Sequence, residues 1–159
     1  MVLNPPTKPN QVPNLRQRDV REQKIIVTKV TTTSYVSISP TTFHAGAPDT
    51  DQVSFAAGGT FGVNMADVDC FAEVNLPHGA IVTAVVTYSN VSDETWTLKR
   101  KTISTGSVTN MVSDNMNTEN STITNATIDN STYSYHIETS SLDNTDDIYG
   151  ARITYTTTS

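Results

Sequence analysis

The sequence predicts an all-β protein, an antiparallel β-sandwich or jelly roll with an extended N-terminal arm. Short segments rich in β-branched and aromatic residues recur along the chain, and no segment shows the period of an amphipathic helix. Only 36% of the residues are hydrophobic and 16% are charged, because threonine, serine and asparagine are abundant. Threonine is typical of strands, whereas serine and asparagine are typical of turns, so the composition supports the same fold class.

The arm is predicted from the first 23 residues. This segment holds four prolines, which favour an extended path, and it shows neither a strand period nor a helix period. We therefore divide the chain into a basic, proline-rich arm, residues 1–23, and a sandwich domain, residues 24–159.

The predicted strands are short and are separated by turn residues. In chain order they are KIIVTKV (24–30), SYVSI (34–38), VSFAA (53–57), TFGVNM (60–65), VDCFAEV (68–74), AIVTAVVTYS (80–89), TWTLKRKTI (95–103), SVTNMV (107–112), TYSYHIET (132–139) and YGARITYT (149–156). Strands at this spacing are typical of a sandwich. The polar stretch 113–132 predicts a long exposed loop or an edge hairpin, which Ile123 and Ile128 would attach to the core.

Strict alternation along these strands predicts which side chains share a face. It places Tyr149, Ala151, Ile153 and Tyr155 together, and it places His136 on the outward face of its strand. The strand at 80–89 is apolar on both faces, which indicates a central or covered strand. We expect a neighbouring subunit to cover its half-polar face, which comprises Ile81, Thr83, Val85 and Thr87.

Charge is distributed unevenly along the chain. Residues 1–30 hold six basic and two acidic residues, whereas the remainder holds four basic and fourteen acidic residues. A disordered tail is one interpretation of the basic segment. The other is an arm that docks on the acidic body of a neighbouring subunit, since arginine pairs bidentately with carboxylates. The residues expected at that interface are Arg16, Arg18, Arg21 and Lys24. Nucleic acid is disfavoured as a partner, because the acidic body would repel phosphate.

Three segments resemble a β-sandwich domain of phage virion proteins and bacterial surface proteins. They are LPHGAIVTAVV (76–86), ATIDNSTYSYHIE (126–138) and YGARITYT (149–156), and they cover roughly the last ninety residues. The shared pattern is a Leu-Pro-x-Gly-Ala turn followed later by a Tyr-Gly-x-Arg-Ile-x-Tyr strand. These motifs specify packing, so the resemblance implies a fold and a setting and assigns no catalytic residue.

The sequence predicts no enzyme. His44 lies in a loop, His78 in a Pro-His-Gly turn, and no Gly-x-Ser-x-Gly motif appears. Cys70 and Trp96 alternate with their neighbours as core residues do. We expect no cofactor, although the acidic segments DTD (49–51), DVD (67–69) and DNTDD (143–147) leave a structural calcium ion as an alternative to solvated loop acids.

The leading hypothesis is a non-enzymatic structural protein of a virion: a decoration, minor capsid or fibre-associated subunit. No run of apolar residues is long enough to cross a bilayer, and residues 1–14 lack the apolar core of a signal peptide. The expected partners are further copies of the chain, as a trimer, and a major capsid or other virion protein. The alternatives are an extracellular filament or sheath subunit that assembles by strand addition, and a carbohydrate-binding β-sandwich module.

Overall fold

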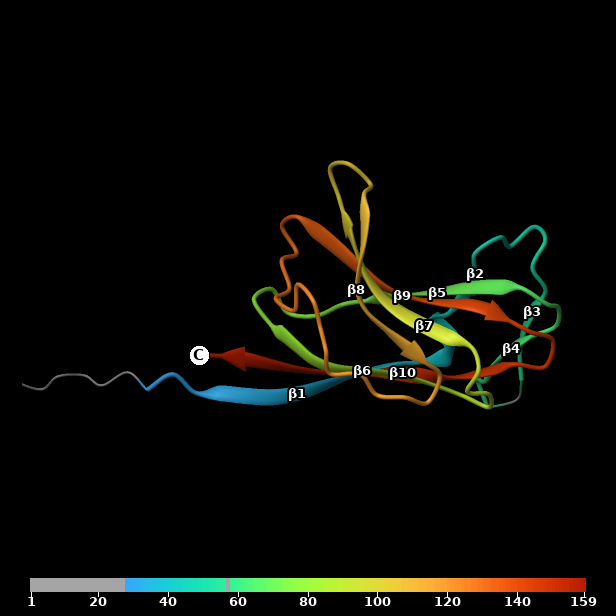
Figure 1. Cartoon of the computed structure of the whole chain (residues 1–159), viewed down its shortest axis with the longest axis horizontal. Coiled ribbons are helices and arrows are strands. Elements are labelled where there is room, and N and C mark those ends of the chain that lie inside the picture. Colours follow the sequence, from blue (N-terminus) through green and yellow to red (C-terminus); the bar gives the residue numbers. More distant parts are fainter. Residues whose placement is uncertain (1–27, 57) are drawn as a thin grey trace, which may run out of the picture.

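A computed structural model of the chain describes residues 28–56 and 58–159. This part of the chain forms two antiparallel five-stranded sheets that lie one above the other, so the predicted β-sandwich is confirmed (Figure 1). The arm, with Arg16, Arg18, Arg21 and Lys24, lies outside the described residues.

The first sheet, sheet A, is built around one long strand. It contains β1 (Thr31–Ile38), β3 (Val53–Phe55), β4 (Phe61–Val63), β6 (Ile81–Ser89) and β10 (Asp147–Thr158). β10 pairs with β6 along one edge, and with β1 and then β4 along the other, while β3 pairs with β4. A short 3₁₀ turn, η2 (Pro40–Thr42), follows β1.

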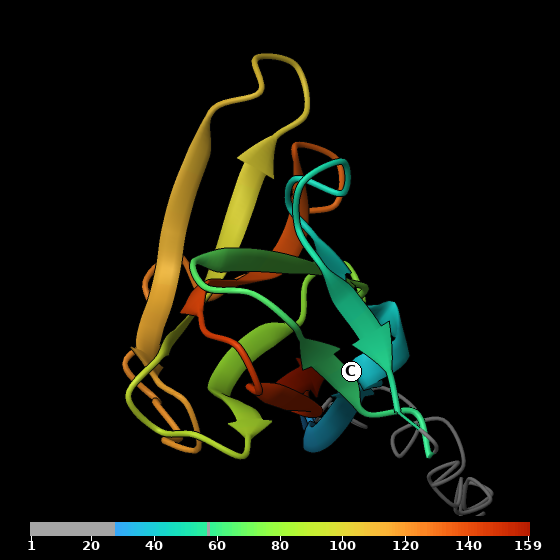
Figure 2. The same cartoon turned by 90° about the vertical axis from the view of Figure 1, so that its right-hand side faces the viewer.

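The second sheet, sheet B, has the strand order β2-β5-β9-β7-β8. Its strands are β2 (His44–Ala45), β5 (Val68–Val74), β7 (Thr95–Thr102), β8 (Val108–Asn115) and β9 (Tyr133–Leu142). The β7–β8 hairpin projects from the body in both views (Figures 1 and 2). Every pairing in both sheets is antiparallel.

The core fills the space between the two sheets. Its largest fully buried side chains include Trp96, Phe43 and Phe61. The indole N–H of Trp96 donates to the carbonyl of Asn115 at 2.9 Å, so the one polar atom of this ring is paired. Cys70 is also fully buried. Both residues therefore occupy the core positions that alternation predicts.

A β-bulge in β6 changes the predicted faces of that strand. Pairing with β10 skips Thr83, whose hydroxyl donates to the carbonyl of Thr154 at 3.2 Å. The extra residue reverses the alternation, so Val82 and Val85 both point into the core. The predicted half-polar contact face, Ile81, Thr83, Val85 and Thr87, is therefore wrong, since Val85 and Thr87 are fully buried.

A second bulge lies near the start of β10. The register shifts between Ile148 and Gly150, and Ile148 and Ala151 are both buried while the side chain of Tyr149 is 52% exposed. The predicted shared face of Tyr149, Ala151 and Ile153 is therefore wrong for Tyr149. Gly150 has a φ of 122°, which side chains with a Cβ rarely adopt.

Residues 113–115 of the polar stretch 113–132 end β8, and residues 116–132 form a long loop that covers the outer edge of β6. Backbone N–H groups of Val82 and Val85 donate to loop carbonyls at 2.9 and 3.1 Å. Ile128 is 1% exposed and Ile123 packs against the core. Of the two predicted alternatives the long loop is observed, and both isoleucines attach it as expected.

Other differences lie at the ends of elements. Residues 28–30, the described end of the predicted strand 24–30, fall outside β1, although Val30 exchanges two backbone hydrogen bonds with Ser159. β2, only two residues long, has too little pattern to be predicted. The remaining strands match their predicted positions within a few residues.

Candidate functional site

The outer face of sheet B brings charged and aromatic side chains together. Antiparallel pairing aligns residues of neighbouring strands in rows that run across the sheet. The rows are His44–Phe71–Glu138, Glu73–His136–Lys99 and Ser134–Lys101. The side chains in these rows point outward, because the residues that alternate with them along each strand are buried in the core.

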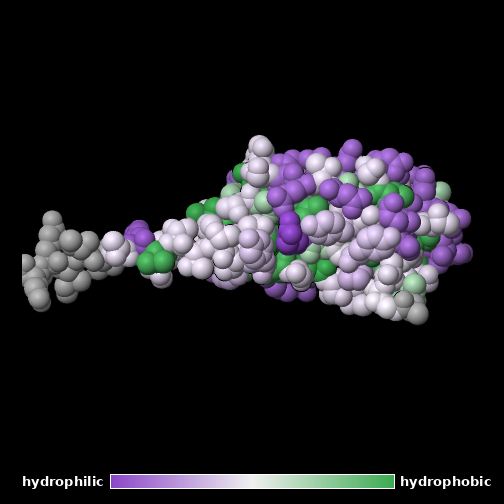
Figure 3. Space-filling view, turned by 90° about the horizontal axis from the view of Figure 1, so that it is seen from below, coloured by the Kyte–Doolittle hydropathy of each residue, from purple (hydrophilic) through white to green (hydrophobic). Residues whose placement is uncertain are grey.

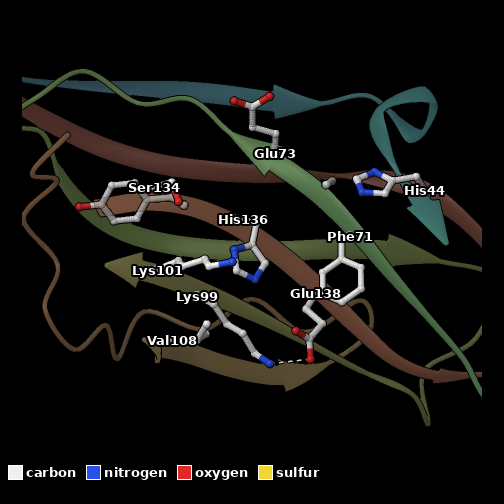
Figure 4. A pocket seen from close by; sticks show the side chains of 11 residues that line it. His44, Phe71, Glu73, Lys99, Lys101, Val108, Ser134, His136 and Glu138 are labelled. Carbon is white, nitrogen blue, oxygen red and sulfur yellow. Dashed lines mark hydrogen bonds and ion pairs between the residues drawn. The ribbon is translucent and has the colours of Figure 1, made fainter. Parts of the chain in front are cut away.

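These rows line an open hollow of about 630 Å³, which we call the sheet B hollow. Val108, at the start of β8 in the β7–β8 hairpin, adds an apolar side chain to the lining. Figure 4 shows the side chains of Phe71, His136, Glu138 and Lys99 side by side over β5, β9 and β7. The hollow therefore spans sheet B, and its side chains come from all five strands of that sheet.

Three rings form a continuous aromatic row on this face. The ring centroids of His44 and Phe71 are 6.3 Å apart, and those of Phe71 and His136 are 5.9 Å apart. Phe71 and His136 are each partly buried, and both line the hollow. Such rings offer a flat apolar surface beside polar groups.

The charges of the sheet B hollow balance. Lys99 and Glu138 form an ion pair whose side chains are 17% and 20% exposed, and Lys101 and Glu73 line the same hollow. Two lysines therefore face two glutamates. A ligand in the hollow would meet donors and acceptors with no net charge.

His136 is held in its neutral form. Burial lowers its pKa below the ordinary value, Glu138 opposes this shift, and Lys99 and Lys101 add to it. The neutral imidazole has one N–H donor and one acceptor nitrogen. At neutral pH His136 can therefore donate to one ligand group and accept from another.

The predicted outward position of His136 is confirmed, and His44, expected in a loop, lies in β2. His78 is an exposed turn residue whose Nδ1 accepts the backbone N–H of Asn130 at 3.2 Å. Sequence reasoning did not select Phe71 or the charged residues of the hollow. Alternation in VDCFAEV and TWTLKRKTI could place them outward, but only the strand order brings the two faces together.

The other candidates have structural roles. Burial raises the pKa of the Cys70 thiol to about 12, so it stays protonated and unreactive at neutral pH. In the predicted acidic segments, Asp51, Asp69 and Asp146 each accept a backbone N–H and so hold their loops. Throughout the described ranges, no three His, Cys, Asp or Glu side chains are grouped to hold a metal ion. The absence of a cofactor stays a prediction, with a structural calcium ion as its alternative.

No helix among the described residues is long and apolar enough to span a membrane. The interface residues Arg16, Arg18, Arg21 and Lys24 lie outside these residues, as does the arm on which the trimer and capsid contacts were predicted. Those contacts, and the virion setting, stay predictions.

Comparison with known proteins finds no matching family model and no matching curated protein. Among solved structures, the C-terminal CBM6 of LamC, a marine laminarinase from Zobellia galactanivorans, matches with a TM-score of 0.46 and 14% identity, over 76% of this chain and 98% of that chain. A family two carbohydrate esterase from Cellvibrio japonicus matches with a TM-score of 0.39 and 6% identity, over 81% of this chain and 35% of that chain. At these values the likeness carries no statement about what this chain binds.

Proposed function

We propose that the chain is a non-catalytic binding module that takes neutral carbohydrate in the sheet B hollow. The observation that carries this proposal is the row of rings, His44, Phe71 and His136, set among polar side chains whose charges balance. Ligand sites are typically concave, with aromatic surface and a few polar groups that fix orientation.

The balance of charge decides the ligand class. A polyanion would meet Glu73 and Glu138, and a polycation would meet Lys99 and Lys101. A neutral sugar avoids both repulsions, because its hydroxyl groups both donate and accept and can use all four charged partners. The apolar faces of sugar rings match the flat surface of Phe71.

The position of the Lys99–Glu138 pair also favours binding over cleavage. Each partner satisfies the other, so Glu138 is an oriented hydrogen-bond acceptor with its charge compensated. The pair and the aromatic row sit on paired strands, which keeps the surface preorganised and lowers the entropic cost of binding.

The proposal is tested by gel electrophoresis in gels that contain one polysaccharide each, neutral (β-glucan, xylan, mannan) or acidic (alginate, pectate). We expect at least one neutral polymer to retard the protein. Phe71→Ala should abolish the retardation, and Phe55→Ala, which truncates an exposed aromatic side chain of sheet A, should retain it.

Two results would overturn the proposal. One is the absence of retardation by every neutral polymer, and the other is retardation that Phe71→Ala leaves unchanged while circular dichroism shows both variants folded. Formation of reducing ends during incubation would instead identify a hydrolase.

A further inference from the structure

The edges of the two sheets are protected to very different degrees. β2 and β3 are only two and three residues long, and the outer edge of β6 is covered by the loop 116–132. On β8, the carbonyls of Met111 and Ser113 accept hydrogen bonds from that loop. β1, in contrast, is an edge strand of sheet A and is eight residues long.

β1 also lacks the features that normally prevent strands from pairing at an edge. Its sequence, TTTSYVSI, contains no charge, no proline and no glycine. Its eight residues pair with β10 in one unbroken register, without a bulge. A long, uncharged edge without a bulge is a template for another strand.

The register shows which backbone groups face outward. Val30 and Ser159 exchange two hydrogen bonds, of 3.2 and 3.1 Å, and antiparallel ladders alternate between hydrogen-bonded and non-hydrogen-bonded pairs. The even-numbered residues of β1 therefore bond to β10, and the odd-numbered residues direct their N–H and C=O groups to the free edge. These residues are Thr31, Thr33, Tyr35 and Ser37, and all four are exposed.

Among the residues that the structure describes, no strand other than β10 pairs with β1. The beginning of β1 and the end of β10 extend beyond the sandwich as a two-stranded ribbon (Figure 1). Seen from below, the surface of this ribbon is mostly pale, as expected for threonine and serine (Figure 3). No backbone hydrogen bond joins the four outward-directed residues to any other part of residues 28–56 and 58–159.

We propose that β1 pairs with β1 of a second copy of this chain, about a two-fold axis that crosses Ser34. This antiparallel register sets Thr33 opposite Tyr35 and Thr31 opposite Ser37, so every outward N–H and C=O on both strands finds a partner. The absence of charge on β1 lets two identical strands meet without repulsion, although each chain carries a net charge of −6.

The pairing joins two A sheets into one continuous sheet. The edge belongs to sheet A and the hollow to sheet B, so both hollows of the dimer stay open to ligand. An isologous interface of this kind closes on itself, and the assembly stops at two copies. The inference does not depend on the proposed carbohydrate binding, and either can fail alone.

The test is the mass of the full chain in sedimentation velocity over a roughly hundredfold range of concentration, since mass action controls a dimer. We expect twice the monomer mass at high concentration and the monomer mass on dilution. Thr33→Pro removes an outward N–H and leaves the bonds to β10 intact, so it should halve the mass while the circular dichroism spectrum is retained. Thr33→Ala, which keeps the N–H, should remain dimeric.

Amide exchange gives a second measurement in case Thr33→Pro does not fold. In the wild-type dimer, the amides of Thr31, Thr33, Tyr35 and Ser37 should exchange slowly, and dilution should make them fast. A monomer at every concentration, a dimer in which these amides exchange rapidly, or a folded Thr33→Pro dimer would overturn the proposal. Slow exchange in a particle of monomer mass would do the same, because the chain would then cover its own edge.

Discussion

Gly150→Ala is predicted to be among the most damaging single-methyl substitutions in the protein. The added Cβ would lie 2.6 Å from the carbonyl oxygen of Ile38 and 3.4 Å from Cδ of Pro40. The backbone φ of 122° is also unfavourable for alanine. Strain at such a position costs about 1–3 kcal/mol, and overpacking against backbone adds about 1–3 kcal/mol. We expect a loss of about 4 kcal/mol, a large part of the stability of a typical domain.

Gly79→Ala is the matched control. Gly79 has a φ of 79°, and a methyl group added there would point into open space, with no atom within 4 Å. This variant should therefore lose only the left-handed strain, about 1–2 kcal/mol. The reduced freedom of the unfolded chain stabilises both alanine variants equally and cancels in the comparison.

The assay is urea unfolding of the two variants and the wild type, with the midpoints compared at a common slope. The free energy of unfolding of Gly150→Ala should be lower than that of Gly79→Ala by at least about 2 kcal/mol. This difference is the cost of the close contact between the added methyl group and β1. Equal midpoints would refute the reasoning, because they would show that β1 yields to the methyl group at no cost.

Two further predictions concern polar groups. Double-mutant cycles with Lys99→Met and Glu138→Gln should give a coupling of about 1 kcal/mol, because the pair is mostly shielded from water. The exposed pair Arg152–Glu119, whose side chains are 43% and 48% exposed, should give a smaller coupling that high salt removes; equal couplings would contradict this ranking. The Cys70 thiol should resist a thiol reagent in the folded protein and react once urea unfolds it. Because burial raises its pKa from 9.0 to about 12, the unfolded thiol ionises first, and stability should fall as the pH rises through that interval. Cys70→Ala should lack this part of the alkaline loss, and an unchanged pH profile would argue against a buried thiol.

The local patterns of the sequence predict most of the strands. In VDCFAEV and TYSYHIET, regular alternation correctly separates the core side chains from the outward ones, including His136. The rule fails in β6 and β10, where Thr83 and Tyr149 are the extra residues of two bulges. A bulge depends on how two distant strands align, so alternation within one strand cannot reveal it.

The sequence by itself determined the fold class, the core positions of Trp96 and Cys70, and the turn at Gly79, because each depends on the order of neighbouring residues. Only the tertiary structure decided the sheet B hollow. Phe71, His136 and Lys99 lie on three strands that are far apart in the chain, and their meeting depends on strand order and register. The edge position of β1 among the described strands was decided in the same way, since an edge is defined by the strands that lie beside it.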